Sequence, residues 1–332
     1  MIKSLVNLYK TAKAKVESLF DEADSEAWDF AGFIPAIVVG IIVLSTFYIC
    51  FGLASKETII KHSPWTNLAR DIPTLISGTT QVKVKAISAV AFDADSKTRI
   101  FNQNGDEVRS IASLTKLMTA ITFLDTKPDW NKEVAIQQSD LQTGAKANVF
   151  VGDRIKLKDL FTFALIASDN TAVTALIRST GISEKDFVAL MNKKAKELRL
   201  ASMQFSDPTG LDVNNRGSAA NVSKLAEEAF SHKEITDALK LSTYSFSVSP
   251  ELTRKVFSTN QLLGRSLPMG AKMLIGKTGH LNEAGYCFTG IFTYKGKMIM
   301  TTVLGAPLDE NRFSETVKIL DWTLRSYLWN NK

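Results

Sequence analysis

The chain has 332 residues, of which 45% are hydrophobic and 22% charged, and its formal net charge at pH 7 is +6. This composition is ordinary for a globular protein with a sizeable core. Two distant cysteines, Cys50 and Cys287, and three scattered histidines do not indicate a disulfide framework or a metal site. The positive charge suits an anionic partner such as a cell wall or lipid headgroups, although scattered surface lysines explain it equally well. No arginine–aromatic pattern indicates nucleic-acid binding.

An uncharged segment near the N-terminus, residues 30–54, is longer than the roughly 20 residues that a helix needs to cross a bilayer. We predict a lead (1–29), one transmembrane anchor (30–54) and a linker (55–82). A cleavable signal peptide is the alternative, but the long lead and long apolar core argue against cleavage. Apolar residues in the lead recur at helical spacing, which would suit an amphipathic helix on the membrane or against a partner. A disordered lead is the alternative interpretation. Flanking charges do not decide the orientation of the anchor.

A folded domain is expected from residue 83 to residue 332. Two strands joined by a turn are predicted at 84–92 and 98–104 because apolar runs there flank the polar stretch DADSK. Apolar residues at helical spacing predict four helices in the middle of the domain. These predicted helices cover residues 110–125, 157–168, 183–200 and 218–231, the last with Ser218 as its N-cap.

The end of the chain predicts a β-hairpin followed by a helix. The hairpin strands are 284–294 and 297–306, with Lys-Gly as the turn, and the last helix covers about 311–329. Helices therefore lie between strands from both ends of the chain. This arrangement predicts an α+β fold in which an antiparallel sheet closes around a helical middle.

Ser113 and Lys116 carry the first chemical pattern, in the stretch SIASLTKLMTA. Side chains three residues apart on a helix lie side by side, so the lysine can reach the serine hydroxyl. A lysine buried among apolar side chains loses affinity for its proton and can then act as a base. One Ser-x-x-Lys pattern is weak by itself, and a solvent-facing serine and lysine would explain it as well.

Two further motifs follow in the chain. Ser168 and Asn170, in the stretch SDN, can relay a proton and hold a peptide, or they can simply cap a helix. Lys277, Thr278 and Gly279 form KTG, in which a cation and a hydroxyl can hold a carboxylate. The glycine lets a substrate backbone lie beside a strand. A plain polar turn is the alternative.

The order SxxK, SDN, KTG is typical of penicillin-binding proteins and class A β-lactamases. With these motifs in place, residues 84–330 resemble the D-alanyl-D-alanine carboxypeptidase/endopeptidase family of low-molecular-mass penicillin-binding proteins. The stretches RSIASLTKLMTA, FSDPTGLDVNNRGSAANVSKLA and GKTGHLNEAGYC are also similar to segments of that family. The resemblance implies a β-lactamase-like fold, with the site between a five-stranded antiparallel sheet and a helical subdomain.

The resemblance also implies roles in catalysis. Ser113 would form an acyl-enzyme with the carbonyl of a D-alanyl-D-alanine or D-amino-acid cross-link bond of peptidoglycan. Lys116 would be its general base, and Ser168 would pass a proton to the leaving amine. No cofactor is implied.

Substrate binding would fall to the other motif residues. Asn170 would hydrogen-bond the substrate amide, and Lys277 and Thr278 would bind the terminal carboxylate. The backbone N–H groups of Ser113 and His280 would form an oxyanion hole. The implied partners are peptidoglycan stem peptides and β-lactams as covalent inhibitors. The implied location is the bacterial cell membrane, single-pass, with the N-terminus inside and the catalytic domain outside the cytoplasm.

Two departures keep alternatives open. Asp169 stands where this family more often has glycine and class A β-lactamases have aspartate. Those enzymes also need a deacylating glutamate, for which Glu197 is the nearest candidate, but it reads as a solvated helix charge. A β-lactamase and a penicillin-binding sensor or scaffold without turnover are therefore the alternatives to the DD-peptidase. The choice between carboxypeptidase and endopeptidase stays open, with a slight preference for the endopeptidase.

Overall fold

The computed structural model describes residues 72–142 and 148–329, which lie in one compact unit of the chain. The predicted lead, the predicted anchor and residues 55–71 of the predicted linker lie outside the described residues. Within the described part of the chain, no helix is both long enough and apolar enough to cross a membrane.

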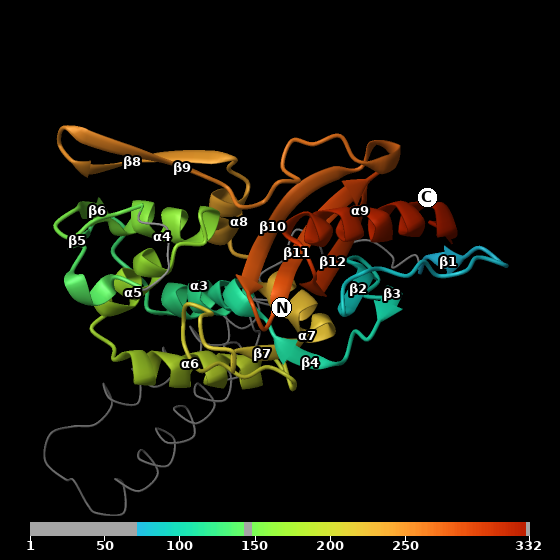
Figure 1. Ribbon diagram of the computed structural model, residues 1–332, viewed down its shortest axis with the longest axis horizontal. Coiled ribbons are helices and arrows are strands. Elements are labelled where there is room, and N and C mark those ends of the chain that lie inside the picture. The colour runs from blue at the N-terminus through green and yellow to red at the C-terminus, as the bar shows by residue number, and fades with distance from the viewer. Residues whose placement is uncertain (1–71, 143–147, 330–332) are drawn as a thin grey trace, which may run out of the picture. The chain divides into compact units, whose positions relative to one another are not determined.

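A five-stranded antiparallel sheet forms one side of the domain (Figure 1), with strand order β10-β11-β12-β2-β3. Strands from the start and the end of the domain meet in it, because β2 pairs with β12. The predicted antiparallel sheet is thus confirmed. Its strands are β2 (Ser88–Asp93), β3 (Arg99–Gln103), β10 (Lys272–Leu281), β11 (Gly285–Tyr294) and β12 (Lys297–Ala306).

Helices cover both faces of the sheet, which explains why its central strands are buried along most of their length. Successive strand residues point to opposite faces, so Cys287 packs with one core cluster and Phe288 with the other. Helix α9 (Asp309–Ser326) buries Phe313 and Leu320 against the Phe288 face. Helix α7 (Ala219–Ala229) packs on the opposite face, where Ser223 bonds Thr302 of β12.

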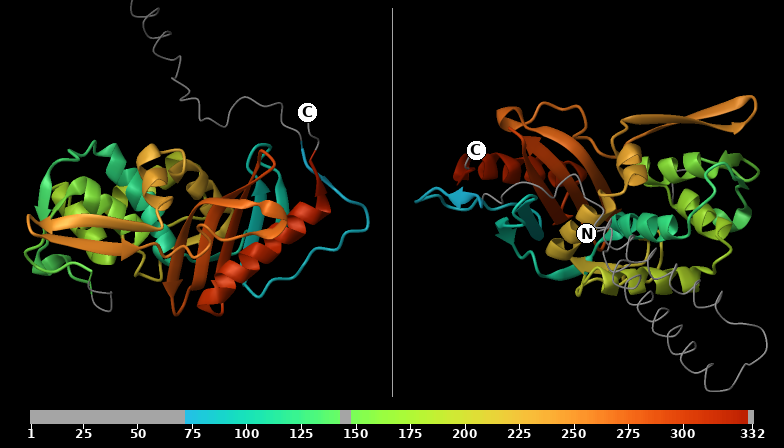
Figure 2. Two further views of the ribbon diagram at one scale, coloured as in Figure 1. Left: turned by 90° about the horizontal axis from the view of Figure 1, so that it is seen from above. Right: turned by 180° about the vertical axis from the view of Figure 1, so that it is seen from behind.

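The helical lobe lies beside the sheet, and α3 runs through its middle (Figures 1 and 2). Its helices are η1 (Ala112–Leu114, a 3₁₀ turn), α3 (Thr115–Asp125), η2 (Gln138–Asp140), α4 (Leu157–Ile166), α5 (Asn170–Ser179), α6 (Glu184–Glu197) and α8 (Lys233–Leu239). Short strand pairs complete the domain: β1 (Thr74–Leu75) with β13 (Tyr327–Leu328), β4 (Val108–Ser110) with β7 (Arg216–Ser218), β5 (Glu133–Ala135) with β6 (Arg154–Lys156), and β8 (Thr243–Ser249) with β9 (Leu252–Phe257). The turn η3 (Pro268–Gly270) leads into β10.

The predicted helices and the C-terminal hairpin are all present, with shifted ends. Ser218 caps α7 as predicted, because its hydroxyl accepts a hydrogen bond from the N–H of Asn221. The predicted strand 84–92 begins only at Ser88, and the last helix gives way to β13 at Tyr327. Strand β10 and the β8–β9 hairpin were not predicted from the sequence, because polar and glycine residues interrupt their apolar alternation.

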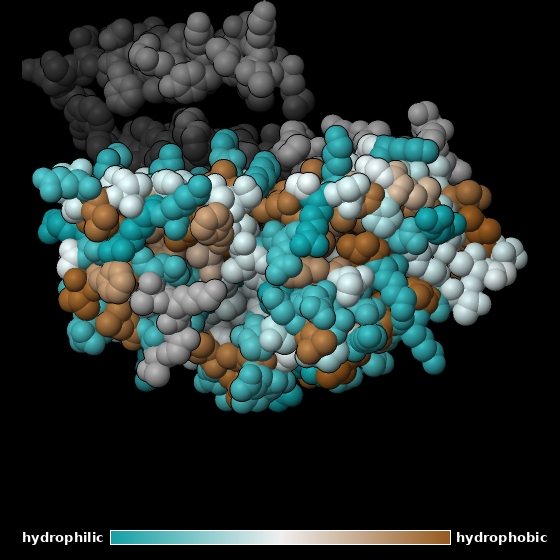
Figure 3. Space-filling model, turned by 45° about the horizontal axis from the view of Figure 1, so that its top comes forward, coloured by the Kyte–Doolittle hydropathy of each residue, from teal (hydrophilic) through white to brown (hydrophobic). Residues whose placement is uncertain are grey.

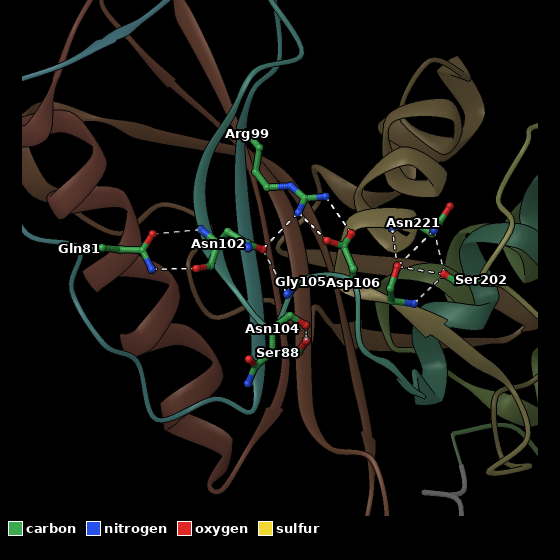
Figure 4. A network of polar contacts seen from close by, with 10 residues as sticks. Gln81, Ser88, Arg99, Asn102, Asn104, Gly105, Asp106, Ser202 and Asn221 are labelled. Carbon is green, nitrogen blue, oxygen red and sulfur yellow. Dashed lines mark hydrogen bonds and ion pairs between the residues drawn. The ribbon is translucent and has the colours of Figure 1, made fainter.

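A polar network fixes the turn that leads towards the nucleophile segment (Figure 4). Gln81 exchanges two hydrogen bonds with the backbone of Asn102, and the side chain of Asn102 accepts one from the N–H of Gly105. The guanidinium of Arg99 binds both carboxylate oxygens of Asp106, at 2.7 and 2.9 Å. The network lies just before β4, which ends three residues ahead of Ser113.

Candidate active site

Ser113 lies in the short turn η1, not within the helix that was predicted for residues 110–125. The turn η1 lies between the end of β4 and the start of α3, where the chain changes from strand to helix. Ala112 has a left-handed backbone, with φ of +48°, which is unusual for a residue other than glycine. The N–H of Ile111 donates to the carbonyl of Asn215, which ties the turn to the loop before β7. The serine is therefore held by a strained backbone at the N-terminal end of α3.

Lys116 reaches Ser113 from the first turn of α3. Its Nζ atom lies 3.0 Å from the hydroxyl oxygen of Ser113, 2.6 Å from Oδ1 of Asn170 and 2.5 Å from the carbonyl oxygen of Thr209. The side chain is fully buried. Burial lowers the pKa of Lys116 to about 7, against the opposing effect of the carboxylates of Asp169 and Asp207. Much of the lysine is therefore neutral at neutral pH.

The loop that supplies the Thr209 carbonyl is organised around the carboxylate of Asp207. One oxygen accepts hydrogen bonds from the N–H and the hydroxyl of Thr209 and from the N–H of Gly210. The other accepts from the N–H of Asp212 and the side-chain amide of Asn215. These bonds hold the Thr209 carbonyl on Lys116.

Gly210 lets this loop touch the nucleophile turn. Its φ is +87°, and a Cβ atom at this position would lie only 2.3 Å from the carbonyl oxygen of Ala112. No side chain fits such a gap, so a glycine is required by both conformation and space.

Ser168 forms a second serine–lysine contact on the opposite side of the site. The Nζ atom of Lys277 lies 2.6 Å from the Ser168 hydroxyl and 2.9 Å from the carbonyl oxygen of Thr278. Ser168 has φ of +58° in the link between α4 and α5. Asp169 follows it as the N-cap of α5 and accepts a hydrogen bond from the N–H of Ala172 at 2.8 Å. This cap orients Asn170, the first residue of α5, towards Lys116.

The KTG motif lies within β10, at the edge of the sheet that faces the nucleophile turn. A Cβ atom on Gly279 would lie 3.0 Å from the carbonyl oxygen of Ile111 and 3.2 Å from the backbone nitrogen of Ser113. The glycine thus permits close approach of the strand to the serine. The hydroxyl of Thr278 lies 2.6 Å from that of Thr259. His280 stacks on Tyr286 with ring centroids 4.0 Å apart.

The site is rich in buried basic side chains. Burial lowers the pKa of Lys277 well below its usual value, and the nearby charges of Lys116 and Arg312 act in the same direction. Arg312, in the first turn of α9, donates a hydrogen bond to the carbonyl of Gly279 at 3.1 Å. Burial, followed by the charge of Arg312, also lowers the pKa of His280. An arriving carboxylate would favour the charged form of Lys277 again.

The structure brings all predicted site residues together in one place, between β10 and the helical lobe. The three motifs contact one another through Lys116 with Asn170 and Lys277 with Ser168. Four further residues contribute to the site and were not predicted from the sequence, namely Thr209, Asp207, Thr259 and Arg312. Thr209 stands in the Pro-Thr-Gly-Leu stretch noted above, but Arg312 and Thr259 carry no local signal. Glu197 lies half-exposed on α6 and pairs with Lys193 and Lys194, as expected of a solvated helix charge.

Comparison with known proteins agrees with this geometry. The profile of the peptidase S11 family, described as D-alanyl-D-alanine carboxypeptidase, matches residues 76–308. The chain belongs to this family. It is therefore a serine-type D-alanyl-D-alanine carboxypeptidase/endopeptidase, a hydrolase, and the predicted family is confirmed.

Relatives of this DD-peptidase come from several bacteria. The D-alanyl-D-alanine endopeptidase of Escherichia coli strain K12 is 29% identical over 248 residues, which cover 73% of this chain and 78% of the relative. The D-alanyl-D-alanine carboxypeptidase DacF of Bacillus subtilis strain 168 is 29% identical over 262 residues, covering 75% and 64% respectively.

Two solved structures place the DD-peptidase among known folds. The Streptomyces K15 DD-transpeptidase matches with a TM-score of 0.68 at 24% identity, covering 74% of this chain and all of that one. Penicillin-binding protein D2 from Listeria monocytogenes, in its cefotaxime-bound form, matches with a TM-score of 0.64 at 28% identity and the same coverage. The likeness extends over the sheet and the helical lobe together.

Proposed function

We propose that this DD-peptidase hydrolyses D-alanyl-D-alanine or D-amino-acid cross-link bonds of peptidoglycan through an acyl-enzyme on Ser113, outside the cytoplasm and anchored by residues 30–54. One observation carries the mechanism. Of the three oxygen atoms around Lys116 Nζ, two are carbonyl oxygens, of Asn170 and Thr209, which can only accept hydrogen bonds. A neutral amine has two N–H groups for them, and its lone pair is then left for the proton of Ser113.

Acylation follows from that arrangement. Ser113 Oγ attacks the carbonyl carbon of the scissile bond while its proton passes to Lys116 Nζ. The developing oxyanion would be held by the N–H groups of Ser113 and His280, on the turn and the strand that Gly279 brings into close approach. Removal of the serine proton by a general base such as Lys116 typically raises the rate by about 10²- to 10⁴-fold.

The second serine–lysine contact suits the leaving group. When the tetrahedral intermediate collapses, the C–N bond breaks and the leaving amine needs a proton, which Ser168 passes on from Lys277. Lys116 gives up the proton that it took from Ser113, which replaces the proton that Lys277 delivered through Ser168, so both lysines return to their starting state. Water then attacks the ester carbonyl, Lys116 takes one proton from the water and passes it to Ser113 Oγ as the C–O bond breaks, and the acid leaves. The sum is one peptide bond and one water converted into an acid and an amine.

The cations beside β10 suit a substrate with a free carboxylate. Lys277 and Thr278 lie on the strand along which an extended peptide would run, and Arg312 adds a third polar group behind Gly279. A terminal D-alanine carries its carboxylate one residue beyond the scissile carbonyl. Asn170 lies beside Lys116, which binds its Oδ1 atom, so the NH2 group of Asn170 can donate a hydrogen bond to a carbonyl of the substrate backbone.

The proposed location rests on the substrate and on sequence. Peptidoglycan lies outside the cytoplasm, so a catalytic domain that follows an anchor at 30–54 would place the N-terminus inside. The relatives named as endopeptidase and carboxypeptidase support either bond as the target.

Purified cross-linked and uncross-linked muropeptides test the proposal, with products followed by mass and a fluorescent penicillin used in parallel. We expect release of D-alanine, or of monomers from dimers, with both the products and the penicillin label lost in Ser113→Ala. Stable labelling without muropeptide products would favour a sensor or scaffold. Rapid penicillin turnover would favour a β-lactamase. Full activity of Ser113→Ala would refute the mechanism.

A further inference from the structure

An apolar ribbon projects from the end of the domain where the described chain begins and ends. Strands β1 and β13 form it, with Thr74 paired to Leu328 and Leu75 to Tyr327. Figure 1 shows β1 at the far end of the domain from the β8–β9 hairpin. We define the terminal ribbon as residues 72–76 and 326–329.

The terminal ribbon exposes large aliphatic side chains on both of its faces. Ile72 is 63% exposed and Leu328 60%, while Leu75 and Ile76 are 45% and 38% exposed. Leu75 and Leu328 belong to different cross-strand pairs, and neighbouring pairs point to opposite faces. Figure 3 shows apolar side chains at this end of the domain as well as at other places on the same face. Four large exposed aliphatic side chains within one short ribbon favour a contact site, since exposed apolar residues on an ordinary surface are scattered singly.

Aromatic side chains make the terminal ribbon stiff. Tyr327 contacts Trp322 and Trp329, with ring centroids 5.9 and 6.1 Å apart. The indole of Trp322 donates a hydrogen bond to the carbonyl of Thr80, and the N–H of Ile76 donates to the carbonyl of Ser326. This packing and these hydrogen bonds hold the ribbon against α9, with its aliphatic side chains exposed.

Basic residues occur in the segments that continue the ribbon along the chain, although Asp71 directly precedes it in the sequence. The segment 72–85 has two lysines, Lys83 and Lys85, and no acidic residue. On α9, Lys318 and Arg325 are exposed, and the only acidic neighbour within 317–329, Asp321, is paired with Arg325 at 2.9 Å. An apolar tip whose neighbouring segments carry more basic than acidic residues suits a bilayer surface with anionic headgroups.

The position of the ribbon along the chain also favours a bilayer as its partner. The ribbon begins at Ile72, and only residues 55–71 separate it from the uncharged segment 30–54. Fully extended, that stretch spans at most roughly 60 Å, so this distance is the upper limit between an embedded 30–54 and the start of the ribbon. Most of the ribbon, including β13, lies outside the family match at 76–308.

From these observations we infer that the terminal ribbon inserts its aliphatic side chains into the headgroup region of the membrane that holds residues 30–54. The inference rests on the anchoring part of the proposed function. It gives the catalytic domain a second contact with the bilayer and so a fixed orientation, with the opposite end of the domain, at the β8–β9 hairpin, directed away from the membrane.

The full chain in lipid nanodiscs tests this, with a polarity-sensitive dye on a single cysteine. Leu328→Cys carries the dye in a Cys50→Ser background. Cys287 is fully buried and burial raises its thiol pKa to about 11, so it will not react under native conditions. We expect a blue-shifted emission, quenching by lipids with nitroxide groups near the headgroup, and protection from aqueous iodide.

Leu252→Cys is the matched control, because Leu252 is 47% exposed at the start of β9 near the other end of the domain. Its dye should remain aqueous. Replacing Leu75 with lysine in the Leu328→Cys chain should return the first dye to water, while muropeptide activity stays unchanged.

Three results would overturn the inference. An aqueous dye at position 328 in a chain that stays with the nanodiscs would reject the ribbon contact and keep the anchor. A blue shift without lipid quenching would show that protein, from this chain or a second copy, covers the ribbon. Failure of the chain to stay with nanodiscs would reject the anchor and the ribbon contact together. The peptidase reaction would still be tested independently, by the muropeptide assay.

Discussion

The Nζ atom of Lys277 lies 2.6 Å from the hydroxyl of Ser168, although 109 residues separate the two along the chain. Lys116 makes the corresponding contact with Ser113 at 3.0 Å. The site therefore contains two serine–lysine pairs, both with a fully buried lysine. One pair lies at the nucleophile turn, and the other joins the helical lobe to the sheet.

Acylation of this enzyme should depend on the protonation of Lys116. The neutral amine is the base, and burial lowers its pKa to about 7, so the base form grows as pH rises through that value. We expect the second-order rate constant for β-lactam acylation to rise from pH 5.5 to 8.5 with a midpoint near 7. Stopped-flow fluorescence measures it. A flat profile, or a midpoint above 9, would contradict the assignment of Lys116 as base.

Asp169→Asn should shift that profile to lower pH. The asparagine oxygen can still accept the hydrogen bond from Ala172 N–H and cap α5, but the negative charge that raises the pKa of Lys116 is removed. The midpoint should fall by about one pH unit. Asp186→Asn, which changes an exposed acid in the first turn of α6, is the control and should leave the midpoint in place. A midpoint that stays or rises in Asp169→Asn would show that Asp169 does not tune the base.

Ser168 and Lys277 should act as one unit in turnover. Ser168→Ala and Lys277→Ala should each lower kcat/KM on muropeptides by about 10²- to 10³-fold. The double variant should lose little more than either single variant, because each removes the same proton relay. Steady-state kinetics on all four proteins give the coupling, and circular dichroism checks their folding. If the losses in kcat/KM multiply in the double variant, Ser168 and Lys277 act independently and do not form one proton relay.

Gly210→Ala should displace the nucleophile turn. Its new Cβ would meet the Ala112 carbonyl at 2.3 Å, so the turn or the loop must move. We expect penicillin acylation to fall at least tenfold and the protein to lose more than the roughly 1–2 kcal/mol of left-handed strain alone. Thermal unfolding and acylation rates measure both effects.

Gly181→Ala is the matched control for the Gly210 variant. Gly181 has φ of +74°, but no neighbouring atom lies within 4 Å of the place that a Cβ would take, so the substitution adds strain without a clash. It should lower stability modestly and leave acylation unchanged. Equal effects of the two substitutions would mean that the contact between the loop and the turn has no role.

The amino-acid sequence by itself determined the local features of this protein. Apolar periodicity located the helices and the C-terminal hairpin because side-chain spacing reports which face is buried. Ser218 showed the start of α7 because capping needs only the N–H of a residue three positions later. The three motifs identified the family because each carries its chemistry within three or four consecutive residues.

Tertiary structure decided the environment of those motifs. The lowered pKa of Lys116 comes from burial by segments far apart in the sequence, and its third oxygen comes from Thr209, 93 residues away. Arg312 reaches the site only because α9 packs on the sheet beside Gly279. Such contacts depend on which surfaces pack together, and neither residue spacing nor local propensity records that. The sequence therefore named the reacting groups, whereas the fold set their distances, their burial and their charge.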